Sequence, residues 1–237
     1  QMASGELIVV AAGDDISTPN RIETIVDYWL AHDKKPLLMA SYLMDMDESG
    51  AVFDPIEVQD LGLWKSMDDW MRSRPSVIGA AHAWSKQLFE QFGQFPESAI
   101  FEDQVAVFRA ILLGRAHTIP EPLVLYRRGG VSSTLHQKNK SDAELRKQWR
   151  KIKDAYAVHA QFVEDAKIVG RGDELAQFFS KYMSREKFLL DIYRSPGFLS
   201  DLKIITKLDG PDLGFRCRKY LQNYGDRQRM RAMGIIG

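Results

Sequence analysis

Hydrophobic and polar positions change in blocks along the first half of the chain, and the blocks predict strands that alternate with helices. Continuous apolar runs of strand length cover residues 6–12, 37–46 and 77–84. Residues 19–32 and 102–113 instead carry apolar side chains at every third or fourth position, which marks one face of a helix. Helices that alternate with strands favour an α/β layered fold, and we expect mostly parallel strand pairing.

The ends of these blocks carry residues that begin and end helices. Residues 17–19, Ser-Thr-Pro, are expected to begin the first helix, because serine and threonine cap a first turn and proline fits its first position. Ser85 is expected to cap a helix that ends near Gly93. A further helix is expected to begin at Glu102 and to end at Gly114.

The pattern changes in the second half of the chain. A polar stretch at 137–140 indicates a linker, and from residue 141 onward the apolar spacing is helical to the end. The apolar positions on these helices are expected to form a core: Leu145, Trp149, Ile152, Tyr156, Phe178, Tyr182, Phe188 and Leu189. The sequence therefore predicts an α/β domain over 1–135 and a helical region over 141–237.

Charge and cysteine content exclude several classes of protein. The 237 residues contain 32 basic and 32 acidic side chains, so net charge gives no reason to bind nucleic acid. The single cysteine, Cys217, cannot form an intrachain disulfide, which is typical of a reducing compartment and favours a cytoplasmic location. No apolar run approaches the roughly 20 residues that span a bilayer.

Two adjacent carboxylates follow the first apolar strand. Asp14 and Asp15 stand at its carboxyl end, and open α/β sheets bind ligands beyond the carboxyl ends of their strands. Carboxylate oxygens are the ligands that hard divalent cations prefer, and such a cation also binds phosphate oxygens. The pair therefore predicts a metal site, with a polar turn before a helix as the alternative.

A second acidic pair, Glu102 and Asp103, begins a helix after a loop. A carboxylate there can act as a general base on a sugar hydroxyl, and the helix N-terminus favours its ionised form. The alternative is that both residues only stabilise the first helical turn.

Adjacent arginines end the last predicted strand of the α/β domain. Arg127 and Arg128 are followed by Gly129 and Gly130, a combination that can surround a phosphate group. A basic turn that leaves a strand is the alternative.

The order and spacing of these segments resemble family 2 glycosyltransferases. Residues 5–21 are similar to the metal-binding segment of that family, and residues 101–110 to its Glu-Asp segment. Residues 119–127, Ile-Pro-Glu-Pro-Leu-Val-Leu-Tyr-Arg, are similar to the family's "epLv-YR" strand, and residues 45–50 to the hairpin between these motifs. The resemblance covers about residues 1–133.

The resemblance implies a GT-A-like α/β fold and an inverting sugar transfer. Asp14 and Asp15 match the family's metal-binding aspartates, which implies Mg²⁺ or Mn²⁺ and a nucleotide-diphosphate sugar as donor. Asp103 matches the catalytic base, with Glu102 beside it. The family's habit further implies a saccharide or lipid-linked glycan as acceptor.

Three departures from the family pattern alter these expectations. Ala12 stands where an earlier aspartate is usual, and Gly129 stands where a histidine often follows the Tyr-Arg strand. The family's upstream nucleotide-base unit is not found in these residues, so residues 1–135 match only the C-terminal half of a catalytic domain. We therefore expect the strand at 6–12 to belong to a sheet interior, and the isolated chain to be inactive. A non-catalytic binding or assembly module is the alternative.

The C-terminal segment from Pro211 to Gly237 is more basic than the rest of the chain. Its six basic residues face only two acidic ones, and aromatic and aliphatic side chains alternate with them. Such a helix can lie on an anionic membrane surface, which predicts peripheral contact at the inner face, while a solvated helix face is the alternative. The residues do not decide between a monomer and a homo-oligomer.

Overall fold

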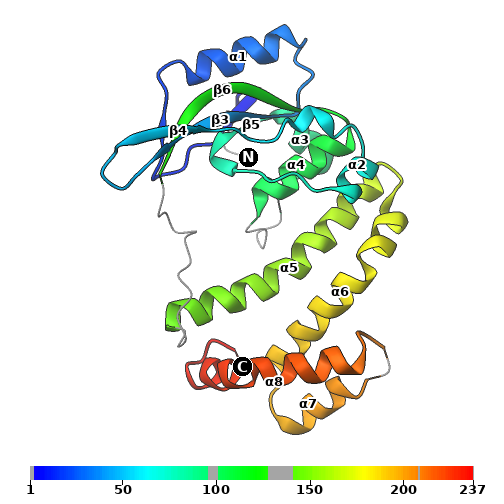
Figure 1. Cartoon of the computed structure of the whole chain (residues 1–237). Coiled ribbons are helices and arrows are strands. Elements are labelled where there is room, and N and C mark those ends of the chain that lie inside the picture. Colours follow the sequence, from blue (N-terminus) through cyan, green and yellow to red (C-terminus); the bar gives the residue numbers. More distant parts are fainter. Residues whose placement is uncertain (1–2, 96–100, 128–140, 208, 237) are drawn as a thin grey trace. The chain divides into compact units, whose positions relative to one another are not determined.

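The computed structural model describes residues 3–95, 101–127, 141–207 and 209–236 and forms two compact units (Figure 1). The sheet unit comprises the described residues up to 127, and the helical unit comprises those from 141 onward.

The sheet unit is built on a mixed sheet. Its strands follow the order β1 (Leu7–Val9), β5 (His82–Ser85), β3 (Leu38–Met46), β6 (Ala116–Arg127) and β2 (Ile16–Ser17), and β4 (Val52–Ile56) pairs with β3. Among the described residues only β3 and β6 are parallel neighbours. The α/β class is therefore confirmed, whereas the expectation of mostly parallel pairing is wrong. Long connections also join the adjacent pairs β1 and β5, β3 and β5, and β2 and β6, yet these pairs are antiparallel, so alternation of strands with helices did not decide strand direction.

Helices cover both faces of this sheet, which explains why β3 and β6 are buried. Helix α1 (Arg21–Ala31) lies on one side, and α3 (Lys86–Phe92) and α4 (Glu102–Leu112) lie on the other (Figure 1). Ile25 and Trp29 of α1 pack with Met39 of β3 and Leu123 of β6. On α4 every residue from Val105 to Ile111 is at most 1% exposed. This burial fixes the position of the acidic first turn of α4.

Several predicted elements are confirmed with small shifts in their ends. The strand at 37–46 is β3, the helix from Ser85 to Gly93 is α3, and the helix from Glu102 is α4. The predicted strand at 77–84 is shorter, because Gly79–Ala81 forms the 3₁₀ turn η2 before β5.

The expected start of the first helix at 17–19 is wrong. Ser17 belongs to β2, where it pairs with Val124 of β6, and the Thr18 N–H donates to the Leu123 carbonyl. These sheet contacts hold residues 16–18 extended, so α1 begins only at Arg21, after Asn20. Tertiary pairing has therefore overridden the local capping signal.

The first strand differs from its expected place as well. Strand β1 spans Leu7–Val9 and lies at one end of the strand order, where its described partner is β5. Its three residues are half-buried. The expectation of a sheet-interior strand is therefore not met within the described residues.

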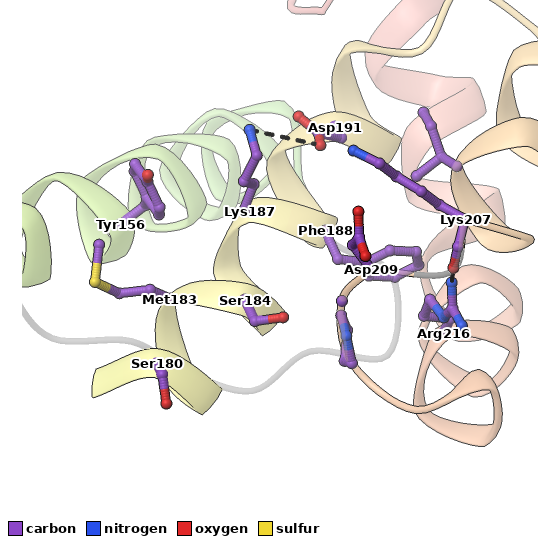
Figure 2. Close-up of a pocket in the computed structure, with 13 residues that line it drawn as sticks. Tyr156, Ser180, Met183, Ser184, Lys187, Phe188, Asp191, Lys207, Asp209 and Arg216 are labelled. Carbon is purple, nitrogen blue, oxygen red and sulfur yellow. Dashed lines mark hydrogen bonds and ion pairs between the residues drawn. The ribbon is translucent and has the colours of Figure 1, made fainter. Parts of the chain in front are cut away.

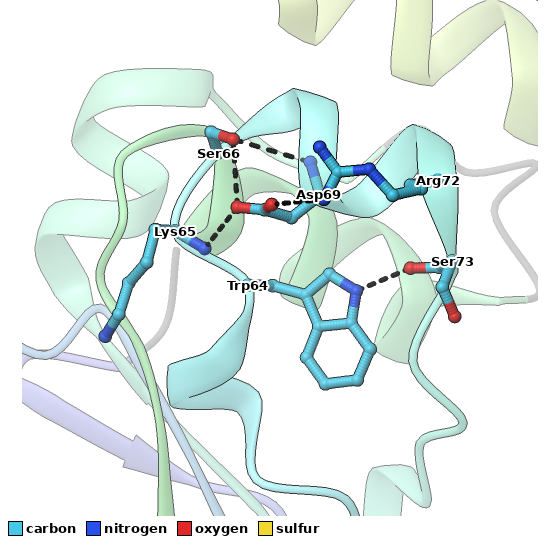
Figure 3. Close-up of polar contacts among 6 residues, drawn as sticks. All are labelled: Trp64, Lys65, Ser66, Asp69, Arg72 and Ser73. Atoms are coloured by element: carbon cyan, nitrogen blue, oxygen red, sulfur yellow. Dashed lines mark hydrogen bonds and ion pairs between the residues drawn. The ribbon is translucent and has the colours of Figure 1, made fainter.

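A polar cluster fixes the short helix α2 (Met67–Arg72), which packs against α4 (Figure 3). Ser66 caps the helix by accepting from the Asp69 N–H, and its hydroxyl donates to Asp69 Oδ2 at 3.0 Å. The Lys65 N–H and Arg72 Nη1 also donate to this carboxylate. These bonds hold the pKa of Asp69 below its usual range, the Ser66 hydroxyl contributing most.

Replacing Ser66 by alanine is expected to destabilise the sheet unit by about 1 kcal/mol, the usual contribution of an N-cap. Urea unfolding of the full-length protein measures this change. Ser73→Ala is the matched control, because the described hydrogen bonds of Ser73 use its backbone alone: its N–H donates to the Asp69 carbonyl and its carbonyl accepts from Trp64 Nε1. Equal losses for the two variants would contradict the capping role.

The helical unit contains four helices within the described residues: α5 (Asp142–Ile168), α6 (Gly172–Arg194), α7 (Phe198–Ile205) and α8 (Leu213–Ala232). Ser141 and Glu144 form a reciprocal capping box at the start of α5. Leu145, Phe188 and Ile192 belong to the core of this unit, as the helical spacing predicts in part. Phe178 and Tyr182 were also expected in the core but are 39% and 53% exposed, so that expectation is wrong.

A buried ion pair joins α7 to α8. Arg227 Nη2 donates to Asp201 Oδ1 at 2.7 Å, and both side chains are at most 2% exposed.

Within the described part of the chain, no helix has the length and apolar character needed to cross a membrane.

Candidate active site

Asp14 and Asp15 lie in the loop between β1 and β2, beside the end of β6. Asp15 Oδ1 accepts from the Arg127 backbone N–H at 2.9 Å, and Arg127 Nε donates to the Asp14 carbonyl at 3.0 Å. The Asp14 side chain is exposed and the Asp15 side chain is half-buried. The structure thus brings three of the predicted site residues together.

The Arg127 side chain joins this loop to a second one. Its Nη1 donates to the carbonyls of Asp47 and Glu48, both at 3.0 Å, in the turn between β3 and β4. Asp47 shapes that turn by accepting from Ser49 and Ala51. Arg127 therefore uses two of its guanidinium nitrogens, Nε and Nη1, to donate to backbone carbonyls. These described contacts hold the two loops in position and do not direct a free pair of guanidinium N–H groups at a phosphate. Arg128 lies outside the described residues.

Burial makes the environment of Asp15 unfavourable for an uncompensated charge. Burial raises the pKa of this carboxyl above its usual range, the hydrogen bond from the Arg127 N–H opposes the increase, and the neighbouring Asp14 adds to it. An ionised carboxylate that burial disfavours gains more from a cation than a fully hydrated one does.

The buried side chain of Arg21 holds the Asp14-Asp15 loop through hydrogen bonds to residues around it. Sequence reasoning assigned Arg21 no role of its own. Its side chain is 2% exposed. Nη1 donates to Ser17 Oγ at 3.0 Å, and Nη2 donates to the carbonyls of Val10 and Ala80 at 2.9 and 2.8 Å. Its charge lowers the pKa of Asp15, as a smaller contribution than burial. No signal in the sequence separates such a buried arginine from a surface one at the start of a helix.

Asp103 lies in the first turn of α4, against η2. A Cβ added to Gly79 would lie 3.0 Å from the Asp103 Cβ, so this glycine permits the close approach. Burial raises the pKa of the Asp103 carboxyl; the hydrogen bond from the Gln104 N–H, 2.8 Å long, opposes the increase, and Glu102 adds to it. Glu102 itself is exposed. Asp103 is therefore the better placed of the pair to hold a proton.

Turn η2 connects the two carboxylates. Gly79 lies against Asp103, and the next residue, Ala80, accepts from Arg21, whose charge acts on Asp15. No direct hydrogen bond between Asp15 and Asp103 is found among the described residues. Each carboxylate has one oxygen that accepts from a backbone N–H, of Arg127 for Asp15 and of Gln104 for Asp103.

His82 follows η2 and is fully buried, which sequence reasoning did not anticipate. Within the part of the chain that the structure describes, neither ring nitrogen has a hydrogen-bond partner, and burial, with a smaller contribution from Arg21, lowers the pKa of His82 to about 3. The imidazole is therefore neutral at physiological pH and adds no positive charge beside the carboxylates.

Asp14 and Asp15 are the predicted metal ligands, and two carboxylates alone do not complete the coordination of a cation. Among residues 3–95, 101–127, 141–207 and 209–236 no group of three or more His, Cys, Asp or Glu side chains could hold a metal ion. Asp14 and Asp15 alone can offer carboxylate oxygens, and Mg²⁺ is typically bound by one or two carboxylates together with phosphate oxygens and water. A metal ion bound at this loop would therefore need ligands besides these two carboxylates, such as phosphate oxygens or water.

No protein-family model matches the chain, and no curated protein matches it.

Proposed function

We propose that this chain carries the metal-binding and acceptor-side part of an inverting glycosyltransferase, cytoplasmic and dependent on Mg²⁺ or Mn²⁺. The observation that carries the proposal is the pair of partly desolvated carboxylates, Asp15 and Asp103. Asp103 lies against Gly79 of η2, and Asp15 interacts with the charge of Arg21, which donates to Ala80 of η2. Their order in the chain is that of the metal and base segments in the glycosyltransferase resemblance.

In this proposal Asp14 and Asp15 bind the cation, whose charge offsets the negative charge on the departing nucleotide diphosphate. Arg21 and Arg127 hold the loop that presents the two aspartates. Neither arginine needs to contact the sugar, because both already bind backbone carbonyls.

Asp103 takes the proton of the acceptor hydroxyl. The acceptor oxygen forms a bond to the anomeric carbon while the bond from that carbon to the diphosphate breaks, and the proton passes to the Asp103 carboxylate. A carboxyl whose pKa burial has raised is a stronger base than an ordinary one, which suits this role. Because attack is on the face opposite the leaving group, the anomeric configuration is inverted.

The acceptor of the sugar is proposed to be a saccharide or a lipid-linked glycan, as the resemblance implies.

Peripheral membrane contact through α8 is supported by its exposed Leu213, Leu221 and Tyr224. It has less support from charge, because Arg216 and Arg227 are buried and face the protein. The remaining exposed cations on this helix are fewer than the sequence indicates.

The proposal predicts manganese-dependent sugar transfer by the full-length protein from a nucleotide-diphosphate sugar. The assay offers a panel of such donors with Mn²⁺, with EDTA as the control, and separates transferred sugar from free sugar. Transfer that EDTA abolishes is the expected result. Free sugar alone would indicate a hydrolase, and metal-dependent nucleotide binding without either product would indicate the non-catalytic module.

A further inference from the structure

A cavity of about 320 Å³ lies among the helices of the helical unit (Figure 2). Apolar side chains from three helices contribute to its wall: Tyr156 of α5, Met183 and Phe188 of α6, and Ile204 of α7. The volume is within the range of small-molecule sites, which begins at about 300 Å³. This cavity involves none of the residues assigned to sugar transfer.

Charged side chains line the same cavity, with an excess of positive charge. Lys187, Lys207 and Arg216 face Asp191 and Asp209 (Figure 2). Lys187 lies 3.9 Å from Asp191, so these two charges largely offset each other. Neither Lys207 nor Arg216 forms an ion pair with a carboxylate of the described residues.

Arg216 is the most informative of these groups, because it is only 8% exposed. One guanidinium nitrogen, Nη1, donates to the Lys207 carbonyl, while the buried Nε has no hydrogen-bond partner among the described residues. Asp209 lines the same cavity but forms no ion pair with Arg216 within the described residues. A buried guanidinium without a paired carboxylate is unfavourable, and an anion in the adjoining cavity would compensate its charge.

We propose that the cavity binds a small organic anion. Its apolar body packs on Phe188 and Met183, and its phosphate or carboxylate group faces Arg216 and Lys207. A guanidinium binds both kinds of anion through paired hydrogen bonds, so the two share one recognition chemistry. Apolar walls with a few placed charges are typical of such sites.

The test is calorimetric titration of the full-length protein with phenyl phosphate, which combines an aromatic body with one phosphate. Binding is expected, and inorganic phosphate and benzyl alcohol should each bind more weakly, because each lacks one half of the recognised group. Arg216→Met should weaken phenyl phosphate binding by about tenfold or more, the usual effect of losing a charged hydrogen-bonding partner. Arg218→Met is the matched control, since Arg218 is exposed on the same helix and does not line the cavity, and it should bind as the wild type does.

A second variant keeps the test decisive if Arg216→Met fails to fold. Ser184 lines the cavity, so Ser184→Phe fills it without changing a charge. It should abolish phenyl phosphate binding while the thermal unfolding midpoint stays close to the wild-type value. No binding of phenyl phosphate to the wild type, or equal binding of inorganic phosphate, would overturn the proposal.

Competition identifies the source of the anion. Vesicles of phosphatidic acid in phosphatidylcholine should displace phenyl phosphate if the cavity accepts a lipid headgroup. A soluble ligand is indicated if vesicles do not compete while monomeric octyl phosphate does. Failure of both competitors, despite their phosphate and apolar parts, would contradict the assigned chemistry.

Discussion

Replacing Asp103 by asparagine is expected to slow sugar transfer by the full-length protein about 100-fold or more, the usual size of a general-base effect, with donor binding unchanged. Asparagine keeps the shape of the side chain against Gly79 but cannot take a proton. Stability should not fall, because burial disfavours the ionised carboxylate that the change removes. Initial rates at saturating donor and acceptor measure the effect.

Glu102→Gln is the matched control for this variant. Glu102 is exposed and adjacent, so its amide should leave most of the transfer rate intact. Near-normal transfer by Asp103→Asn, or equal losses for both variants, would exclude Asp103 as the base.

The same assignment gives the transfer rate a defined pH dependence. A base acts only when ionised, so the rate should fall as the pH drops through the pKa of Asp103. Because burial raises that pKa, the fall should begin above the pH expected from the ordinary value of 3.8. In Asp103→Asn this inflection should be absent from the residual rate.

Replacing Asp15 by alanine is expected to abolish manganese-dependent donor binding. The variant removes one of the two carboxylates in the loop, and the cation depends on both because no third acidic or histidine ligand lies with them in the described residues. Calorimetric titration with a nucleotide diphosphate, with and without Mn²⁺, measures the loss.

Two further variants separate metal binding from loop support. Asp15→Asn keeps an oxygen that can accept from the Arg127 N–H but loses the charge, so it too should lose the manganese dependence. Asp27→Ala removes an exposed carboxylate of α1 and should bind the donor as the wild type does. Donor affinity unchanged in Asp15→Ala would contradict the metal assignment.

Local sequence signals predicted the elements that carry the two carboxylates. Helix α4 was predicted from its apolar spacing and its acidic first turn. The structure has both features, and all residues from Val105 to Ile111 are buried. The Asp14-Asp15 loop was found because an apolar strand ends there, although β1 proves to be only three residues long.

Features that depend on distant pairing were not predictable in this way. Turn η2 and the roles of Arg21 and Gly79 arise from contacts between residues about 24 to 59 positions apart. Ser17 has a capping side chain by type, yet its pairing with Val124 of β6 decides its conformation. Phe178 has a core residue's spacing but is 39% exposed, since spacing alone does not say which helix faces pack against other helices.

The most direct test of the account is one calorimetric titration of a nucleotide diphosphate, repeated with and without Mn²⁺ on three full-length proteins. If Asp15 binds the metal and Asp103 removes the proton, manganese-dependent binding is expected for the wild type and for Asp103→Asn, and none for Asp15→Ala. Binding by the wild type that ignores Mn²⁺, or that persists in Asp15→Ala, would contradict the claim that this loop holds the metal for sugar transfer.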